Sequence, residues 1–258
     1  MVGLTPGVAL DHGIAAALAK DRRIVIASLV LVIALAWLYL WRSAATMADM
    51  GVMAPMGGAG ALGLTLAMWA VMMTGMMLPS AAPAIVLYGT LVRRNAERGT
   101  VLPAVWVFTS GYLAAWIAFS AVAALAQVAL EHAMLMTPQL SVASKGLSGA
   151  VLLAAGVYQW LPAKDVCLRK CRNPLELFTV RWRAGARGAF RMGLEHGLYC
   201  VGCCWTLMLL LFVAGVMNLL WVALIAAFIF IEKLLPGARY TSSIAGLALV
   251  GSAVFLLL

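Results

Sequence analysis

The chain has 258 residues, of which 65% are hydrophobic and 10% are charged, and its formal net charge is +9. Soluble globular domains are about 45–50% apolar and about 25% charged, so this composition excludes an ordinary cytosolic enzyme, a disordered chain and a disulfide scaffold. With a mean hydropathy of +1.02, most of the chain must have lipid as its solvent.

Long stretches without charged residues predict the membrane-spanning elements. A spanning helix needs about 20 mostly apolar residues, and an open sheet cannot satisfy its backbone in lipid. We therefore expect an all-α, polytopic integral membrane helix bundle, a single domain over 1–258 with seven transmembrane helices. They are placed near residues 22–41, 62–88, 102–130, 145–162, 194–215, 218–235 and 240–258. The uncharged stretch 196–231 is too long for one helix, and Gly215-Val-Met-Asn218 is the best place for its turn.

The basic residues predict the orientation of these helices, because they accumulate on the cytoplasmic side of a membrane. With the N-terminus cytoplasmic and the C-terminus outside, all 18 basic residues except Arg42 and Lys145 lie inside. This rule explains the positive charge, so no nucleic acid is expected as a partner. The cytoplasmic loop 163–193 is basic and amphipathic, which is typical of an interfacial helix or loop that lies on anionic lipid. Glu232 and Lys233 end the sixth helix, where we expect them to anchor it at the interface.

Methionine is concentrated before and within the second predicted helix. Four methionines recur at every third residue ahead of it: Met47, Met50, Met53 and Met56. Within the helix, pairs four residues apart are formed by Met72, Met73, Met76 and Met77. Neutral thioether sulfur is a soft ligand that selects Cu(I), but methionine is also a flexible filler of crowded bundles, and both readings stay open. Pro79 and Pro83 should kink this helix and leave carbonyls free.

The cysteines all fall on the predicted cytoplasmic side or in the inner half of a helix. They are Cys167, Cys171, Cys200, Cys203 and Cys204. The cytoplasm keeps thiols reduced, so structural disulfides are not expected. Cys167 and Cys171 have the spacing of one helical turn and could pass or receive a soft metal.

The strongest motif is the run from His196 to Cys204. On a helix, His196, Cys200, Cys203 and Cys204 fall within an arc of about 100°. His196 and Cys204 are about 12 Å apart along the axis, so the three cysteines would converge on one ion with His196 a turn away. Gly197 and Gly202 would let neighbouring helices approach closely. A single cysteine packs as a small hydrophobe, but three cysteines and a histidine on one face favour metal binding.

These motifs also carry a family resemblance, which runs from about Trp69 to Pro236. Its markers include Met72-Met73, Met76-Met77-Leu-Pro-Ser80, Gly111-Tyr112, Lys164, Cys167, Cys171, Gly193, His196-Gly197, Cys200, Gly202-Cys203-Cys204-Trp205 and Glu232-Lys233. The chain resembles a bacterial family described as predicted metal-binding integral membrane proteins (domain of unknown function 2182). Such proteins usually have Thr-Pro-Leu where this chain has Leu161-Pro-Ala163. The resemblance implies metal binding in a multi-span bundle of a bacterial inner membrane, without supplying a reaction or a metal.

Our first hypothesis is a membrane-embedded Cu(I)-binding protein that transports copper or delivers it to a membrane cuproenzyme. The chain is not expected to catalyse a reaction of its own. The metal ligands would be His196, Cys200, Cys203, Cys204, Met72, Met73, Met76 and Met77, with the methionines on a helix facing the cysteines.

Two alternatives remain open. The chain could be an accessory subunit of a membrane redox complex, such as a copper monooxygenase or oxidase, in which packing against partner subunits matters more than metal. It could also be a membrane thiol oxidoreductase that uses Cys200 and Cys203 as a redox couple. A haem protein fits least, because His196 is the only histidine within a predicted span and bis-His ligation needs two.

Overall fold

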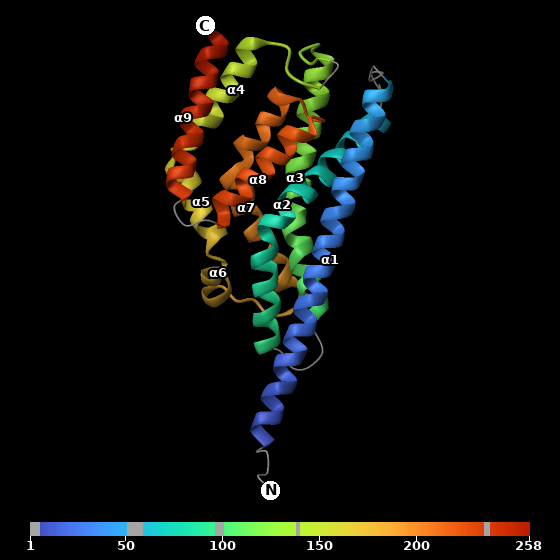
Figure 1. The fold of residues 1–258 in the computed structure, drawn as a ribbon, viewed down its shortest axis with the longest axis vertical. Helices are drawn as coiled ribbons and strands as arrows, with labels where there is room; N and C mark the ends of the chain where they lie inside the picture. The colour runs from blue at the N-terminus through green and yellow to red at the C-terminus, as the bar shows by residue number, and fades with distance from the viewer. Residues whose placement is uncertain (1–5, 51–58, 96–100, 138–139, 235–237) are drawn as a thin grey trace.

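The computed structural model describes residues 6–50, 59–95, 101–137, 140–234 and 238–258. Within these ranges the chain folds into helices, which confirms the all-α prediction (Figure 1). They are α1 (Pro6–Met50), α2 (Ala59–Asn95), α3 (Val101–His132), α4 (Lys145–Tyr158), α5 (Pro162–Arg172), α6 (Pro174–Val180), α7 (Gly185–Ala214), α8 (Leu219–Leu234) and α9 (Ala238–Leu257).

Five helices of the described chain are long and apolar enough to cross a membrane. The candidate segments are Lys20–Thr46, Leu62–Arg93, Ala104–His132, Gly185–Ala214 and Tyr240–Leu257. The other two predicted spans correspond to α4, with 14 residues, and α8, with 16 residues. At 1.5 Å per residue these are about 21 Å and 24 Å long, shorter than a hydrocarbon core of about 30 Å. The structure therefore supports a helical membrane protein, while seven crossings remain a prediction.

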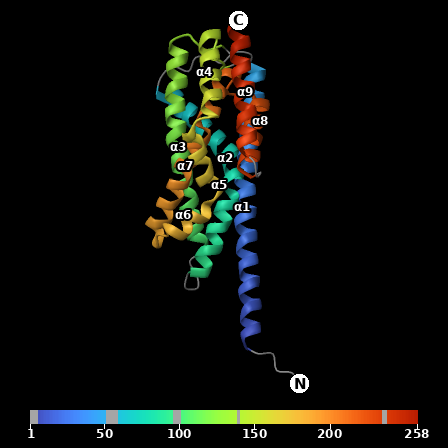
Figure 2. The same ribbon diagram turned by 90° about the vertical axis from the view of Figure 1, so that its left-hand side faces the viewer.

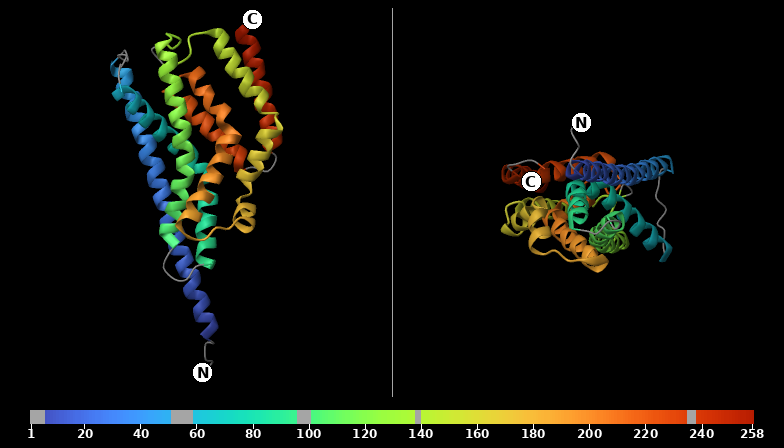
Figure 3. Two further views of the ribbon diagram at one scale, coloured as in Figure 1. Left: turned by 180° about the vertical axis from the view of Figure 1, so that it is seen from behind. Right: turned by 90° about the horizontal axis from the view of Figure 1, so that it is seen from below.

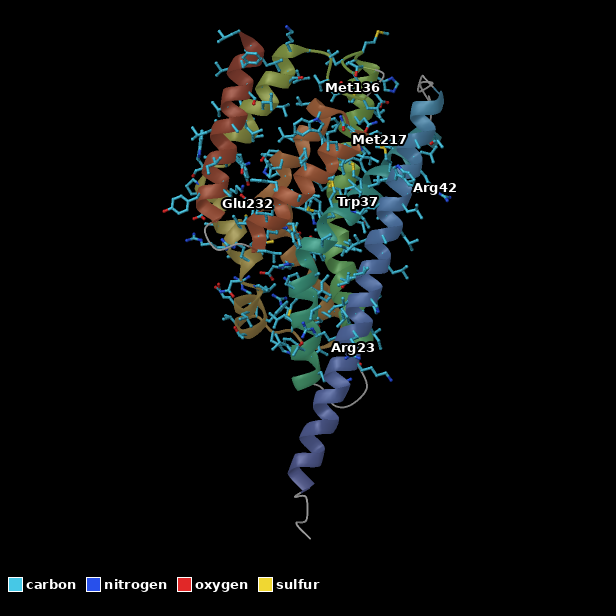
Figure 4. All side chains as sticks on the ribbon, in the orientation of Figure 1. Arg23, Trp37, Arg42, Met136, Met217 and Glu232 are labelled. Carbon is cyan, nitrogen blue, oxygen red and sulfur yellow. The ribbon has the colours of Figure 1, made fainter. Side chains whose placement is uncertain are left out.

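The uncharged part of α1 is bracketed by basic residues. Figure 4 shows Arg23 low and Arg42 high on this helix, on either side of the apolar stretch 24–41. Eighteen helical residues extend about 27 Å, close to the thickness of a hydrocarbon core. This part of α1 has the length that a single crossing requires.

The segment 163–193, expected as an interfacial helix or loop, is largely helical. It forms α5, α6 and the first turns of α7, and Pro162 and Pro174 stand at helix starts, where a missing N–H costs nothing. Figure 2 shows α5 and α6 beyond the lower ends of α4 and α9. One face of α5 is buried and packs against α7. Helix α5 is thus a short amphipathic helix whose buried face belongs to the bundle.

Helices α3 and α7 approach each other closely because glycines line their contact. A β-carbon added at Gly193 would overlap the Phe108 carbonyl oxygen, and one at Gly197 would lie 2.8 Å from the Tyr112 carbonyl oxygen. Small residues of this kind allow helix backbones to pack in lipid. The close approach predicted for Gly197 is confirmed, and it places Tyr112 of α3 beside the cysteine-bearing face of α7.

The turn between α7 and α8 falls where the sequence predicted it. Helix α7 ends at Ala214 and α8 begins at Leu219. Gly215 has a φ of +93°, a left-handed conformation that glycine adopts without steric cost. The turn sends α8 back alongside α7, and Figure 3 shows the two helices side by side from behind.

Helix α2 carries two internal prolines, and its ribbon changes direction between the upper and lower halves (Figure 1). Pro79 has no N–H, so it cannot bond the carbonyl of Gly75 one turn earlier. The indole Nε1 of Trp37 in α1 donates to that carbonyl at 3.3 Å, and Figure 4 labels Trp37 at this contact. The predicted kink and free carbonyl are both present, and a neighbouring helix satisfies the carbonyl.

Candidate metal centre

The soft residues of α7 lie on one buried face of the helix. His196, Cys200, Cys203 and Cys204 are each no more than 2% exposed. The thiols of Cys203 and Cys204 both donate to the carbonyl oxygen of Cys200, at 3.1 Å and 3.0 Å. The three thiols therefore lie within one helical turn, with two of them turned toward the backbone.

A closed ring of hydrogen bonds joins Cys200 to three other helices. Its Sγ lies 3.1 Å from the Tyr112 hydroxyl of α3 and 2.9 Å from Nζ of Lys233 in α8. Tyr112 also donates to the carbonyl oxygen of Met77 in α2, at 3.1 Å. Lys233 reaches Oγ of Ser80 at 3.0 Å, and Ser80 donates to the same Met77 carbonyl at 2.9 Å. Hydrogen bonds thus link four helices in a ring that includes the Cys200 thiol.

Helix α5 adds two more thiols to this junction. Cys171 is buried in the same cluster as Cys200 and Cys203, on the face of α5 that packs against α7. The neighbouring thiols of Cys200 and Cys203, together with burial, raise the pKa of the Cys171 thiol well above its ordinary value. Cys167, one turn earlier, is half-buried, and its Sγ would lie 2.8 Å from a β-carbon added at Gly202. The close approach predicted for Gly202 is confirmed, with α5 as the neighbouring helix.

Lys233 and Glu232 do not anchor α8 at an interface, as the sequence pattern suggested, because both are buried. Glu232 is 1% exposed and Lys233 is 7% exposed. The ammonium of Lys233 instead points at Cys200, where a cation suits a thiolate ligand. The sequence could have indicated that Lys233 has a functional role. Two adjacent charges end an otherwise apolar helix, and charged residues within a membrane are functional candidates.

The methionines of α2 are buried in the same hydrophobic cluster as the cysteines of α7. Met72, Met73, Met76 and Met77 are each no more than 1% exposed. Helices α3 and α8 each pack against both α2 and α7. Tyr112 and Lys233 carry the connection from α2 to Cys200. Of the earlier methionines, Met47 and Met50 have side chains outside the described part, and Met53 and Met56 lie outside the described residues.

His196 lies one turn from Cys200 with an unused ring nitrogen. Its ring centroid is 5.8 Å from that of Tyr112 and 6.3 Å from that of Phe108. In the described part of the chain, its buried Nδ1 atom has no hydrogen-bond partner. A buried polar atom without a partner carries a desolvation cost, and a soft metal ion would remove this cost.

The donors do not form a finished metal site. Among the residues that the structure describes, no group of three or more His, Cys, Asp and Glu side chains is placed to hold a metal ion. The orientation of Cys203 and Cys204 gives the physical reason, because their thiols are turned toward the Cys200 carbonyl. Side-chain rotation and loss of protons would be needed before these thiols could bind a metal together. Thiols and thioethers suit a soft ion, so the donor set fits copper in its reduced state.

A second buried polar cluster lies at the other face of α8. Glu232 accepts from Nζ of Lys164 at 2.5 Å and from the Ser242 hydroxyl, and Lys164 also donates to Gln159. Figure 4 shows Glu232 at the lower end of α8. A cavity of about 190 Å³ borders Gln159, Lys164 and Ser242. Its polar groups are oxygen and nitrogen, so they do not match a soft metal.

Comparison with known proteins gives one family. The model of a family described as PpoB2, copper chaperone, matches residues 66–256. The matched segment includes α3 to α8 and every candidate ligand. No curated protein and no solved structure matches the chain.

Proposed function

The chain belongs to the PpoB2 family of copper chaperones, and from this premise we propose that it carries Cu(I) as cargo in a bacterial inner membrane. A chaperone hands its metal to a recipient, so we favour delivery to a membrane cuproenzyme over transport across the bilayer. The resemblance to predicted metal-binding membrane proteins (domain of unknown function 2182) supports the same role. It covers residues 69–236, within the matched segment.

The observation that carries the proposal is the convergence of thiols at Cys200. Cys200, Cys203 and Cys204 of α7 are buried together with Cys171 of α5, and the ammonium of Lys233 supplies charge beside them. Thiolates are soft ligands that suit Cu(I), and burial shields them from oxidation. Because the thiols are close but not preset around one point, they suit an ion that is bound and then released.

The methionines of α2 are proposed as a second set of ligands. Met72, Met73, Met76 and Met77 lie on a buried stretch that ends at the Met77 carbonyl, one hydrogen bond from Tyr112. Thioethers hold Cu(I) more weakly than thiolates and resist loss of copper to protons, since they carry none. An ion could move from the thioethers to the thiolates, with His196 near the junction.

The proposed topology places this junction near the cytoplasmic face. With the N-terminus inside and the C-terminus outside, α5 and α6 lie on the basic, cytoplasmic side. Glutathione keeps thiols reduced there. The two short helices, α4 and α8, complete seven crossings only if the membrane thins locally or their flanking residues extend into the interface.

Metal analysis of detergent-purified protein tests the proposal. The wild type and a variant with Cys200, Cys203 and Cys204 all changed to Ser are loaded with Cu(I) under reducing conditions. We expect the wild type to hold copper and the variant to lose most of it. Thr206→Ala is the matched control, because it removes a buried hydroxyl of the same helix that has no hydrogen-bond partner in the described structure. Circular dichroism verifies that all three chains are folded.

Two outcomes would replace the proposal. Equal copper in wild type and triple variant would remove the α7 site. A wild type that takes up no copper but co-purifies with other subunits in mild detergent would favour the accessory-subunit alternative.

A further inference from the structure

Helix α5 places its two cysteines on the face that meets α7. Lys164, Leu168 and Cys171 are its buried residues, and their spacing defines one side of a helix. Cys167 adjoins this side and is half-buried, whereas Cys171 is 8% exposed. The two thiols therefore form a short path between the interior and the protein surface.

The contacts of these thiols continue the α7 site without a break. Cys171 lies in the same buried cluster as Cys200 and Cys203, where α5 packs against α7, and Cys167 Sγ lies beside Gly202. Gly202 makes the second contact possible, because even a methyl group there would stand 2.8 Å from Cys167 Sγ. Every thiol of the chain thus has another thiol beside it, from the deepest to the most exposed.

We propose that Cys171 and Cys167 form the exit of the copper site, through which Cu(I) passes from the α7 thiols to a soft acceptor at the surface of α5. This inference rests on the proposed function, since it assigns a route to the same cargo. It adds Cys167 and Cys171 as ligands, whose position beside α7 could not be derived from their spacing in the sequence. The acceptor is a group with thiolate or thioether donors, because these are the soft protein ligands that match Cu(I).

Each transfer step is a ligand exchange that leaves copper as Cu(I). A bond forms between the ion and the incoming sulfur of Cys171, and the bond to Cys200 breaks. The proton of the incoming thiol passes to the thiolate that leaves, so charge and electrons balance. The same exchange from Cys171 to Cys167 brings the ion to the half-exposed position. No oxidant or reductant is required.

Release of copper to a water-soluble chelator measures the route. Detergent-purified protein is loaded with Cu(I) and mixed with bathocuproine disulfonate, and the coloured complex is followed in time. We expect Cys167→Ser to release its bound copper about tenfold more slowly than the wild type, with both rates expressed per bound ion. Val166→Ser, an exposed change on the same helix, should release copper at the wild-type rate.

A second variant separates the route from the number of thiols. Gly202→Ala keeps all five cysteines but forces Cys167 away from α7. It should also slow release while leaving the copper content unchanged.

The outcomes distinguish the two proposals. Wild-type release rates in both Cys167→Ser and Gly202→Ala, with copper still bound, would overturn the exit and leave the chaperone role standing. A wild-type chain that holds no copper would overturn both.

Discussion

Two polar centres flank the lower end of α8, and they differ in the chemistry they collect. Lys233 points to the thiols around Cys200, and its neighbour Glu232 points to Lys164. Adjacent residues on a helix project about 100° apart, so one helix end can serve two sites. The first centre is built from soft sulfur and the second from oxygen and nitrogen. A bundle can thus separate a cluster of soft donors from a buried ion pair within a single turn.

The centres also differ in how their charges are paired and how their polar groups are hydrogen-bonded. Lys164 has both Glu232 and Gln159 as partners, and the pair is 1% exposed on each side. This cluster already has its ion pair in place. The thiols around Cys200 are close together but turned partly toward the backbone. These thiols have hydrogen-bond partners, whereas the buried Oε2 atom of Glu232 has none in the described part of the chain.

The largest expected effect comes from breaking the structural ion pair. Lys164→Met leaves the buried Glu232 carboxylate without its cation, and such changes cost about 3–5 kcal/mol of unfolding free energy. Thermal unfolding in detergent measures the loss. Arg169→Met is the control, because the Arg169 side chain is 69% exposed and its pair with Asp165 contributes at most about 1 kcal/mol. Equal stability of both variants would show that the Lys164–Glu232 pair is not structural.

A smaller loss of stability, with a larger loss of copper, is expected at the thiol centre. Lys233→Met removes the donor to Cys200 and Ser80, but each of these groups keeps another partner. We expect the free energy of unfolding to fall by about 1–2 kcal/mol and the copper affinity to fall about tenfold. Unfolding and a copper titration are measured on the same preparation. If Lys233→Met destabilised the protein as much as Lys164→Met, the distinction between the two centres would fail.

The smallest effect is expected at the hydroxyl that links α2 to α7. Tyr112→Phe removes hydrogen bonds to Met77 and Cys200, while the ring keeps its packing. Ser80 still donates to Met77 and Lys233 still contacts Cys200, so the cost should be about 1 kcal/mol. Copper content should stay unchanged, because the hydroxyl is not a ligand. A strong loss of copper in this variant would mean that Tyr112 controls access to the thiols.

The bounds of the helices were predicted from the sequence better than the contacts between them. Uncharged stretches and the Gly215 turn are local features, and every predicted span lies largely within an observed helix. The segment 163–193 was expected as an interfacial helix or loop, and its amphipathic pattern could be read from the sequence. The packing of α5 against α7 could not, because it depends on residues distant in the chain.

The spacing of the α7 cysteines predicted that they share one face of the helix, whereas the partners of Cys200 on other helices were not predicted. Tyr112, Cys171 and Lys233 lie 88, 29 and 33 residues from it along the chain. No periodicity within a single helix can report contacts of that range. The pair Glu232-Lys233 could have indicated a buried role, because two charges at the end of an apolar helix are costly unless they are paired.

The hydrogen bond from Trp37 to Gly75 has a consequence for how much of the chain is needed. The family match begins at residue 66, so the tryptophan lies outside the matched segment and the carbonyl inside it. A truncated chain without α1 would present a bare peptide oxygen to acyl chains, at a cost of several kcal/mol. Helix α1 therefore supplies the hydrogen bond that Pro79 cannot make to the Gly75 carbonyl. A minimal version of the protein should retain this helix.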